Sequence, residues 1–559
     1  MSKDIIANIK YKELFIPTLL IAMALNVASV VDTMFIASFI GESAVSAIEL
    51  LEPIVLIVAI LEFIFGIGGQ ILSLNHKAEF DEEGSNKYFT LSVAATLIIS
   101  LILSAVFLAG KGAIFHILYP PADAMPYMEQ YATFLFLSFP LSATLGVLCE
   151  FIRVDGQPNF ASALIIIANA INILMDYVLI VIFHMGVRGA AIAMFIGYSI
   201  GLIFYLKYHF DSKRTYHYVL SKMHVRESLK GFIRISKVGF PDASSTVYEI
   251  ILIYIFNRLL SVYLGSIGLT CYALCMDMLL ILSIIIMGLI ETFSTVIPVY
   301  YTQHDYENIR ILYRKTMKYS LGVAALFTII MLVAPDLFLM FYNFNSSPNA
   351  PMFRYVLRLF STTFLPSVFS TLYILYYESI ERSLVSSILS AIGMIIGPLL
   401  AVGLFFPVLG IDSIWISFAF GQILIIITAF ISVKVIEKKQ PKYRGMLLFE
   451  KDLIERTENF NLNSKSDESD VISHLKSLKA DETRCKDVES IINYIFDNND
   501  EEVIVEVLVI DYEDNININI KDTGKSDLFE NMKKDLSYSE KLKSIEVLGL
   551  NNYEYTISK

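Results

Sequence analysis

The sequence predicts an all-α polytopic membrane protein with about twelve transmembrane helices in two parallel six-helix repeats, followed by a small C-terminal α/β domain. Three observations lead to this prediction. Of the 559 residues, 55% are hydrophobic and 18% are charged, whereas soluble proteins carry about 25% charged residues. Apolar runs of about 20 residues, each long enough to cross a bilayer, recur from residue 13 to residue 436. Motifs of the first half also recur in the second half.

This composition excludes several classes of protein for most of the chain. A mean hydropathy of +0.60 does not fit a soluble enzyme or a nucleic-acid-binding protein. Four scattered cysteines, Cys149, Cys271, Cys275 and Cys485, do not form the pattern of a disulfide scaffold. The net charge of −12 is concentrated in residues 441–559, which alone carry about −10. These residues are therefore expected to form a separate acidic, water-soluble domain.

Twelve apolar runs are long enough to be spans. The polar N-terminus lacks a signal-peptide cleavage site, so the first run is expected to remain as a membrane helix. The expected spans lie near residues 13–39, 47–73, 88–110, 126–150, 160–183, 187–208, 240–264, 269–299, 315–341, 352–378, 384–407 and 411–436.

Basic residues predict the orientation of these spans. Lysine and arginine are frequent in the connections after spans 6, 8 and 12, and absent from 41–47, 120–128 and 265–270. Cytoplasmic loops carry the excess of such residues. The protein is therefore expected to span the cell membrane several times, with both termini and the acidic tail in the cytoplasm.

The chain repeats itself internally. Pro17 and Pro241 each open an apolar run 224 residues apart, and Gly186 and Gly410 open spans 6 and 12 at the same offset. Two halves, 1–222 and 223–440, in the same orientation suit an alternating-access carrier with a substrate path between them. The remaining residues, 441–559, form the third expected domain.

Acidic residues lie inside the spans with almost no basic residue to pair with them. A charge at the bilayer centre costs at least ~2.5 kcal/mol, so such acids are candidates for holding a proton or a cation. They are Asp32, Glu62, Asp176, Glu249, Asp277 and Glu291. Asn172 and Asp176 are four residues apart and share a helix face. Glu49, Glu52, Glu150 and Glu378 lie near span ends and are expected to be solvated.

Several stretches resemble the multidrug and toxic compound extrusion (MATE) family. They are Pro17…Val31-Asp32-Thr33, the run from Phe151 to Pro158, Asn172-Ile-Leu-Met-Asp176 and the run from Gly186 to Ala193. The resemblance covers roughly residues 10–437. It implies two six-helix bundles in a V and export of organic cations against proton or sodium entry.

The resemblance also implies roles for single residues. Asp32, Asn172 and Asp176 match the family's cation-site residues, and Glu249 is placed like a glutamate of span 7 in another branch. One departure is Met194, which stands where sodium-binding members have a threonine. A thioether is a poor ligand for a hard cation, so proton coupling is favoured over sodium. Asp277 and Glu291 are candidates for substrate binding or coupling in the second half.

The tail resembles the ATP-binding fold of the histidine-kinase-like superfamily. A helix near 471–496 precedes a hairpin of 503–512 and 515–521. Glu489 and Asn493 look like that fold's catalytic and magnesium-holding residues, and Asp522 with Gly524 looks like its adenine-reading turn. No Gly-x-Gly lid occurs between Gly524 and Val547, and without its amides phosphates lose their cradle. A degenerate regulatory or interaction domain is therefore expected, with ATP binding unlikely.

The resulting hypothesis is a secondary active antiporter, not an enzyme, that exports cationic or amphipathic compounds in exchange for protons or sodium. No cofactor and no metal is expected. The expected partners are an organic cation, the bilayer and, through the tail, a cytoplasmic regulatory protein; no nucleic acid is expected. Two alternatives remain open: a membrane-anchored sensor that uses the tail for interactions, and a flippase for lipid-linked sugars.

Overall fold

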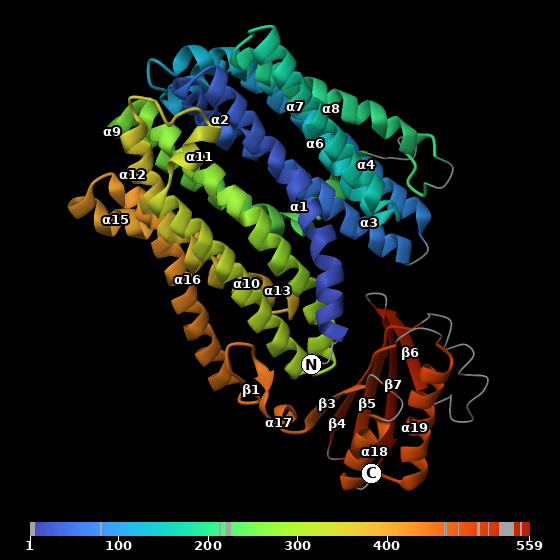
Figure 1. The fold of residues 1–559 in the computed structure, drawn as a ribbon. Coiled ribbons are helices and arrows are strands. Elements are labelled where there is room, and N and C mark those ends of the chain that lie inside the picture. The colour runs from blue at the N-terminus through green and yellow to red at the C-terminus, as the bar shows by residue number, and fades with distance from the viewer. Residues whose placement is uncertain are drawn as a thin grey trace.

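The computed structural model describes most of the chain. The described residues are 6–78, 81–211, 214–219, 225–462, 464, 467–478, 480–499, 503–512, 514–524, 542–547 and 550–558. Figure 1 shows two helical bundles, blue to teal and green to orange, with a separate sheet domain at one end. We call residues 457–559 the tail and name positions in the bundles by their distance from it.

The first bundle is formed by residues up to 209. Its helices are α1 (Ile6–Phe39), α2 (Glu42–Leu61), η1 (Glu62–Ile67), α3 (Gly68–Ala78), α4 (Glu82–Ala109), α5 (Lys111–Leu118), α6 (Met125–Val154), α7 (Pro158–Asp176), η2 (Tyr177–Ile182) and α8 (Val187–His209). The second bundle contains α9 (Val225–Thr302), α10 (Tyr306–Val333), α11 (Asp336–Phe341), α12 (Ala350–Phe360), η4 (Ser361–Thr363), α13 (Phe364–Ser379), α14 (Ser383–Ala391), η5 (Ile392–Ile396), α15 (Gly397–Leu409) and α16 (Asp412–Lys439).

Ten described helical segments are long and apolar enough to cross a membrane, and a shorter apolar helix covers Val27–Phe39 of α1. One of the ten, Ala243–Thr302, has 60 residues and is interrupted at Gly265, where the backbone leaves the helical region. Its two arms make two passes, so each of the twelve expected spans coincides with helix. The prediction of a multi-pass membrane protein is confirmed.

One expected span is displaced. We predicted a span over 315–341, but α10 already begins at Tyr306 and ends at Val333. Pro335 is the cause, because a proline disfavours helical conformation in the residue before it, and Ala334 has φ −135° and ψ 58°. The residues beyond the proline form the short helix α11.

Glycine conformations repeat at the offset found in the sequence. Gly186 and Gly410 have φ of 59° and 58°, and both precede the last helix of their half. Gly41 and Gly265, also 224 residues apart, have φ of 123° and 63° and stand between the first two spans of each half. Left-handed conformations of this kind favour glycine. The repeat is therefore visible in the backbone as well as in the sequence.

The two bundles meet at the tail-distal end. Asp123 accepts hydrogen bonds from Ser43 of the first bundle and from Ser266 of the second, both at 2.6 Å. Asn349 donates to Glu42 at 2.6 Å, and the Arg258 guanidinium stacks over the Tyr119 ring at 3.9 Å. Toward the tail the bundles separate (Figure 1). These contacts thus close the tail-distal end, and the bundles diverge from there toward the tail.

We predict that Asp123→Ala shifts the protein toward opening at the tail-distal end. A hydrogen bond to a charged group is worth about 1.5–3 kcal/mol, so losing the bond from Ser266, which crosses between the bundles, should change the open population roughly tenfold or more. Burial would raise the pKa of Asp123, but the two serine hydrogen bonds outweigh it and hold the pKa below its usual value, so the group is ionised at neutral pH. Distances between spin labels on introduced cysteines at Gly112 and Ser346 report the opening.

The control for this experiment is Glu129→Ala, which removes an exposed acid at the same end. An Asp123→Ala distance distribution that matches that control would show that these hydrogen bonds do not hold the closure.

Near the tail, the start of α1 contacts the second bundle and the start of α9 contacts the first. Tyr11 of α1 donates to the carbonyl of Leu289 in the second bundle and accepts from Thr316. The start of α9 in turn packs on the first bundle, where a Cβ added to Gly68 would lie 2.7 Å from the backbone of Gly239. Such contacts tie each bundle to the other through one helix.

The tail is a five-stranded antiparallel sheet with two helices on one face. Its elements are β3 (Thr457–Leu462), α18 (Glu468–Ser477), α19 (Glu482–Asp497), β4 (Val505–Asp511), β5 (Asn515–Asp522), β6 (Leu542–Val547) and β7 (Leu550–Ser558), with strand order β3-β4-β5-β7-β6. Alternate residues such as Val507 and Ile518 pack on the helices. The predicted hairpin is confirmed, because β4 pairs with β5, whereas the predicted single helix is two.

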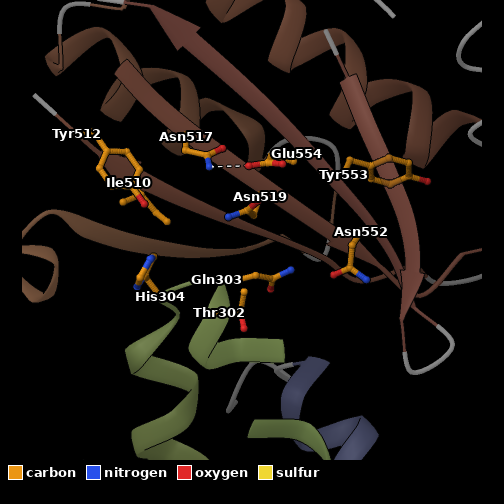
Figure 2. A pocket seen from close by; sticks show the side chains of 10 residues that line it. All are labelled: Thr302, Gln303, His304, Ile510, Tyr512, Asn517, Asn519, Asn552, Tyr553 and Glu554. Carbon is orange, nitrogen blue, oxygen red and sulfur yellow. Dashed lines mark hydrogen bonds between the residues drawn. The ribbon is translucent and has the colours of Figure 1, made fainter. Parts of the chain in front are cut away.

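The other face of the sheet is directed at the membrane bundles. Leu508 and Ile510 of β4 belong to the same buried cluster as the transmembrane core. Polar side chains of β5 and β7, including Asn517, Asn519 and Glu554, lie on this face opposite the end of α9 (Figure 2). The tail is therefore docked onto the bundles by a mixed apolar and polar surface.

A short segment between α16 and the tail is fixed to the second bundle. It consists of β1 (Tyr443–Arg444), β2 (Phe449–Glu450) and α17 (Lys451–Ile454). Carbonyls of its turn accept hydrogen bonds from the hydroxyls of Tyr301, Tyr376 and Tyr377 at 2.7–2.9 Å. Phe449 stacks on Tyr306 with ring centroids 4.3 Å apart. This segment holds the start of the tail in place.

A buried ionic cluster joins the tail to the loop between α9 and α10. The Lys521 ammonium lies 3.2 Å from Asp305 and 3.7 Å from Glu506, with the three side chains 2%, 0% and 0% exposed. Asn308 donates to both acids, and the Lys521 ammonium lies 4.0 Å from the centre of the Tyr300 ring. We call these five residues the docking cluster.

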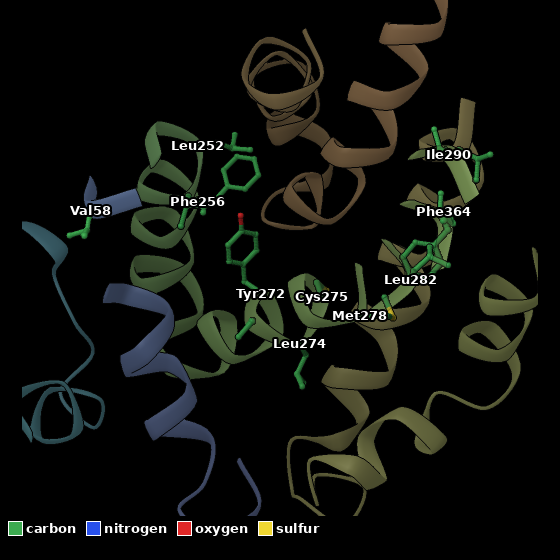
Figure 3. Close-up of a cluster of buried hydrophobic side chains, with 14 of the residues drawn as sticks. Val58, Leu252, Phe256, Tyr272, Leu274, Cys275, Met278, Leu282, Ile290 and Phe364 are labelled. Carbon is green, nitrogen blue, oxygen red and sulfur yellow. The ribbon is translucent and has the colours of Figure 1, made fainter. Parts of the chain in front are cut away.

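The transmembrane core crosses between the two bundles. Val58 of α2 and Leu252, Phe256 and Tyr272 of α9 belong to one buried set (Figure 3). Phe256 and Tyr272 pack edge to face with centroids 6.2 Å apart. Since α9 carries residues of this core along both arms, it positions the walls of the cavity between the two bundles.

Candidate functional site

A cavity of about 600 Å³ lies between the two bundles. It is lined by α1, α2, α6, α7, α8 and both arms of α9. The polar residues that line it are Ser29, Asp32, Thr33, Glu49, Glu52, Tyr131, Asn169, Asn172, Tyr198, Glu249, Asp277 and Ser283. We call it the central cavity.

The acids at and beside the central cavity form two groups, and the first group lies in the first bundle. The carboxyl groups of Asp32 and Asp176 lie close enough to interact with each other. Asp176 is fully buried, and among the described residues neither of its oxygens has a donor hydrogen-bonded to it. Asn172 lies one turn before it on α7 and lines the cavity. Two carboxylates this close repel each other, so this pair is stable when it holds one shared proton.

The second group of acids lies where the two bundles meet. Tyr342 donates a 3.0 Å hydrogen bond to Asp277, and Thr33 of α1 also contacts that carboxyl. Glu249, on the first arm of α9, is exposed to the cavity. Acids from α1, α2 and α9 thus face one space across the boundary between the repeats.

Glu49 and Glu52 were expected to be solvated at a span end, and that expectation was wrong. Both line the central cavity, and Glu49 is 9% exposed. The helix α2 begins at Glu42, earlier than the expected start at residue 47. Both glutamates therefore lie inside the helix. A count of helical turns from Gly41, the helix-breaking residue, could have placed them correctly.

No lysine or arginine lines the central cavity among the described residues. The cavity therefore presents carboxylates without a fixed counter-charge, and such a surface concentrates cations. Its apolar wall includes Met194, Met276 and several leucine and isoleucine side chains. Flexible methionines fit apolar groups of varied shape. The site can hold a cation that also carries an apolar body.

Three of the predicted acids do not line this cavity, and Asp176, which approaches Asp32, is one of them. Glu291 is half-buried on α9 and is not among the lining residues. Glu62 lies in η1 against Gly146, where an added Cβ would be 2.3 Å from its carboxyl carbon. The structure thus brings Asp32, Asn172, Glu249 and Asp277 together and leaves Glu291 and Glu62 apart.

The predicted nucleotide-site residues lie in the tail. Glu489 and Asn493 are on α19, and Asp522 ends β5, where the Gly524 amide donates to its carboxylate at 2.7 Å. The space beside Gly524 is filled by Asn499, 2.5 Å from the position of an added Cβ. Residues 525–541, where the ATP-binding fold would carry its phosphate lid, lie outside the described residues. No finding supports a histidine-kinase-like ATPase site here.

Comparisons with known proteins agree with this architecture. The MatE family model matches residues 17–178. The fold is that of MATE transporters: 77% of the chain superposes on all of an inward-facing multidrug resistance MATE family transporter, with a TM-score of 0.67 at 18% identity. The outward-facing form gives 0.58 over 78% of the chain and 96% of that structure at 19% identity. The chain is thus a multi-pass membrane protein with the fold of MATE transporters, and its residues 17–178 match the MatE family model.

Curated relatives share part of the sequence. The chain is 25% identical over 274 residues to the multidrug export protein MepA of Staphylococcus saprophyticus, a match over 49% of this chain and 60% of that protein. It is 24% identical over 275 residues to MepA of Staphylococcus aureus, with the same shares. The matched region thus spans about 60% of the length of these relatives.

Proposed function

We propose that the chain is a secondary active antiporter that exports cationic or amphipathic organic compounds in exchange for protons by alternating access. The observation that carries this proposal is the central cavity, which lies between two repeats and is lined by acids without lysine or arginine. The names of the MepA relatives and the likeness to MATE folds support it. An anionic lipid phosphate, the cargo of a flippase, would be repelled by this lining.

The acids at the two ends of the cavity have separate tasks in this proposal. Glu49, Glu52, Glu249 and Asp277 attract the organic cation. The Asp32–Asp176 pair carries the proton. Protonation from the outside weakens the hold on the cation and releases it, and loss of the proton to the cytoplasm prepares the cavity for the next substrate. The pair titrates as a unit, because the two carboxyl groups interact.

Protons are favoured over sodium because of the ligands at this end of the cavity. Sodium is a hard cation that needs several oxygen ligands, but Met194 presents a thioether to the cavity. A pair of neighbouring carboxyl groups, in contrast, is suited to sharing one proton. In this proposal both termini lie in the cytoplasm, so the end at which the bundles diverge faces inward.

Proteoliposomes that contain the full-length purified chain test this proposal. A fluorescent cation such as ethidium is loaded, and a pH gradient or a sodium gradient is imposed separately. The dye should move against proton flow, and a sodium gradient at equal pH should not drive it. Transport driven equally by sodium alone would contradict proton coupling, and no transport under either gradient would contradict antiport.

We further propose that the tail is a cytoplasmic regulatory domain whose docking is controlled by the docking cluster. Two acids and one lysine are buried together there, so the cluster is neutral when one acid holds a proton. A cytoplasmic regulatory protein would act on transport by binding the undocked tail. The face of the sheet that such a protein could reach only after undocking carries Leu508 and Ile510.

Docking of the tail should weaken as the pH rises toward 8. Burial raises the pKa of Glu506 to about 8 against a usual 4.5, with Asp305 adding to the rise and Lys521 opposing it. The docked state therefore binds a proton that the undocked state releases, so docking is lost as pH rises through the docked pKa. Asn459 and Asn308 donate to this carboxyl, and Tyr300 faces Lys521. The expected weakening between about pH 6 and 8.5 is tenfold or more.

Spin labels on α19 and α10 would measure this effect as a change in distance distribution. Glu506→Gln imitates the protonated acid and should make docking independent of pH over this range. A wild-type distribution that does not change, or a Glu506→Gln protein with the same pH response as wild type, would contradict the assignment to Glu506.

A further inference from the structure

A second cavity, of about 420 Å³, lies where the tail faces the membrane bundles. Thr302, Gln303 and His304 at the end of α9 form one wall, and side chains of β4, β5 and β7 form the other (Figure 2). The last α9 residue of the central cavity is Ser283, 19 residues before Thr302, or about 28 Å along a helix. The two cavities are therefore distinct, and we call this one the interface cavity.

One carboxamide in the interface cavity is buried without a partner. Asn519 of β5 is 8% exposed and lines the cavity, and among the described residues its side chain has no hydrogen bond. Figure 2 shows it on the side of the sheet that faces Gln303. Burying an amide that forms no hydrogen bond is costly. The Asn519 carboxamide, with one donor group and one acceptor, is therefore a group that a ligand would satisfy.

Two further carboxamides of the lining have an acceptor to spare. In the part of the chain that the structure describes, the side-chain oxygens of Gln303 and Asn517 are buried without a hydrogen-bond donor. The Asn517 amide group already donates to Glu554 at 2.9 Å, so its oxygen is what remains for a ligand. Acceptors therefore outnumber donors in this lining, and a ligand that carries an amine beside an acceptor complements it.

The charged groups near the cavity are matched within the protein. Glu554 accepts the hydrogen bond from Asn517, takes part in a further interaction and stands opposite Lys543 in the register of β6 and β7. The Lys521 ammonium is held by the two acids of the docking cluster. Burial lowers the pKa of His304, so its imidazole is neutral at pH 7. The groups that remain for a ligand are uncharged, and they favour an uncharged ligand.

The remaining side chains of the lining fit a flat ring. Ile510 of β4 is 1% exposed and lines the cavity together with Tyr512. Aromatic side chains such as tyrosine stack on the planes of nucleobases. The volume of about 420 Å³ falls within the range of about 300–1,000 Å³ that is usual for small-molecule sites.

We propose that the interface cavity binds an uncharged planar heterocycle that carries an amine beside a ring nitrogen, the edge that adenine and cytosine share, and that this ligand stabilises docking of the tail. A carboxamide such as that of Asn519 can donate to the ring nitrogen and accept from the amine. The second N–H of the amine is then available to the oxygen of Gln303 or Asn517.

Such a ligand joins the two parts of the protein. Gln303 belongs to the bundles, whereas Asn517 and Asn519 belong to the tail, so one ligand contacts both. A ligand that binds only the docked state shifts the equilibrium toward docking as its concentration rises. The inference is independent of transport, because it requires only that the tail is docked.

Calorimetric titration of adenosine into the full-length protein in detergent tests the proposal. Inosine is the matched comparison, because a carbonyl oxygen replaces the amine and a ring N–H replaces the neighbouring acceptor. Adenosine should bind at least tenfold more tightly than inosine. Adenosine monophosphate should bind no more tightly than adenosine, since none of the described lining residues is lysine or arginine.

Three results would overturn the proposal. Equal binding of adenosine and inosine, or no binding of adenosine, would contradict recognition of the amine-bearing edge by the carboxamides. Binding of the monophosphate at least tenfold more tightly than adenosine would show that a charged group is recognised, and would contradict an uncharged ligand.

Variants locate the site. Asn519→Leu should weaken adenosine binding at least tenfold, because leucine has nearly the size of asparagine but no hydrogen-bonding group. Gln303→Leu, on the opposite wall, should have the same effect and keeps the test valid if Asn519→Leu folds poorly. The controls are Asn498→Leu, the same change at an exposed residue of the tail, and Asp32→Asn in the central cavity. Both should leave binding unchanged. Binding that is lost in Asp32→Asn but kept in Asn519→Leu and Gln303→Leu would place the ligand in the central cavity and overturn this proposal, while leaving antiport intact.

Discussion

Asp32→Asn is expected to abolish proton-driven efflux while the protein still folds and inserts. Asparagine has nearly the same size as aspartate and keeps a hydrogen-bonding group, but it cannot ionise. Asp32 faces the central cavity and interacts with Asp176, so the change removes one half of the proton-sharing pair. Gradient-driven dye efflux in proteoliposomes should fall at least roughly a hundredfold, the order of effect seen when a proton-transferring group is removed.

The matched control is Glu291→Gln. It makes the same kind of acid-to-amide change inside a span, at a position that does not line the central cavity, and should retain most of the transport. Asp176→Asn should resemble Asp32→Asn, because either change breaks the pair. Wild-type efflux by Asp32→Asn would exclude this residue as the coupling site, and Glu249 would be the next acid to replace.

The fold of the membrane part could be predicted because its determinants are local. Span length follows from apolar run length, and the repeat was evident from glycine and proline spacing. Asp32, Asn172, Glu249 and Asp277 could be named from the cost of placing polar groups in apolar helices. Their meeting in one cavity depends on how α1, α7 and α9 pack. The repeat predicted a substrate path between the two halves, but it did not predict this packing.

The features that could not be predicted depend on contacts between distant segments. The docking cluster joins Asp305 to residues about 200 positions later, and no local pattern marks Lys521 or Glu506 as buried. The tail was expected as a separate domain because its composition is polar. Its sheet nevertheless places Leu508 and Ile510 against the bundles. The alternation of side chains along β4 gives the strand two faces, but it does not say which partner covers each face.

Lys521→Met is expected to detach the tail from the membrane bundles. Methionine retains the length and most of the apolar stem of lysine but removes the ammonium, which is 2% exposed and lies 3.2 Å from Asp305. Asp305 and Glu506 would then be buried together without a cation. Removing one partner of a buried ion pair costs about 3–5 kcal/mol, so the docked population should fall by a factor of roughly a hundred or more. Spin-label distances between α19 and α10 should broaden and lengthen.

Two further variants separate loss of charge balance from loss of packing. Lys442→Met removes the partner of Glu450 in an ion pair whose lysine is 58% exposed, and it should leave docking unchanged because exposed pairs contribute little. Adding Glu506→Gln to Lys521→Met removes the cost of protonating or burying that acid on docking and should restore part of the docking. If the double variant is as detached as Lys521→Met alone, the lysine acts through its packing against Tyr300, and the charge balance of the docking cluster is not what holds the tail.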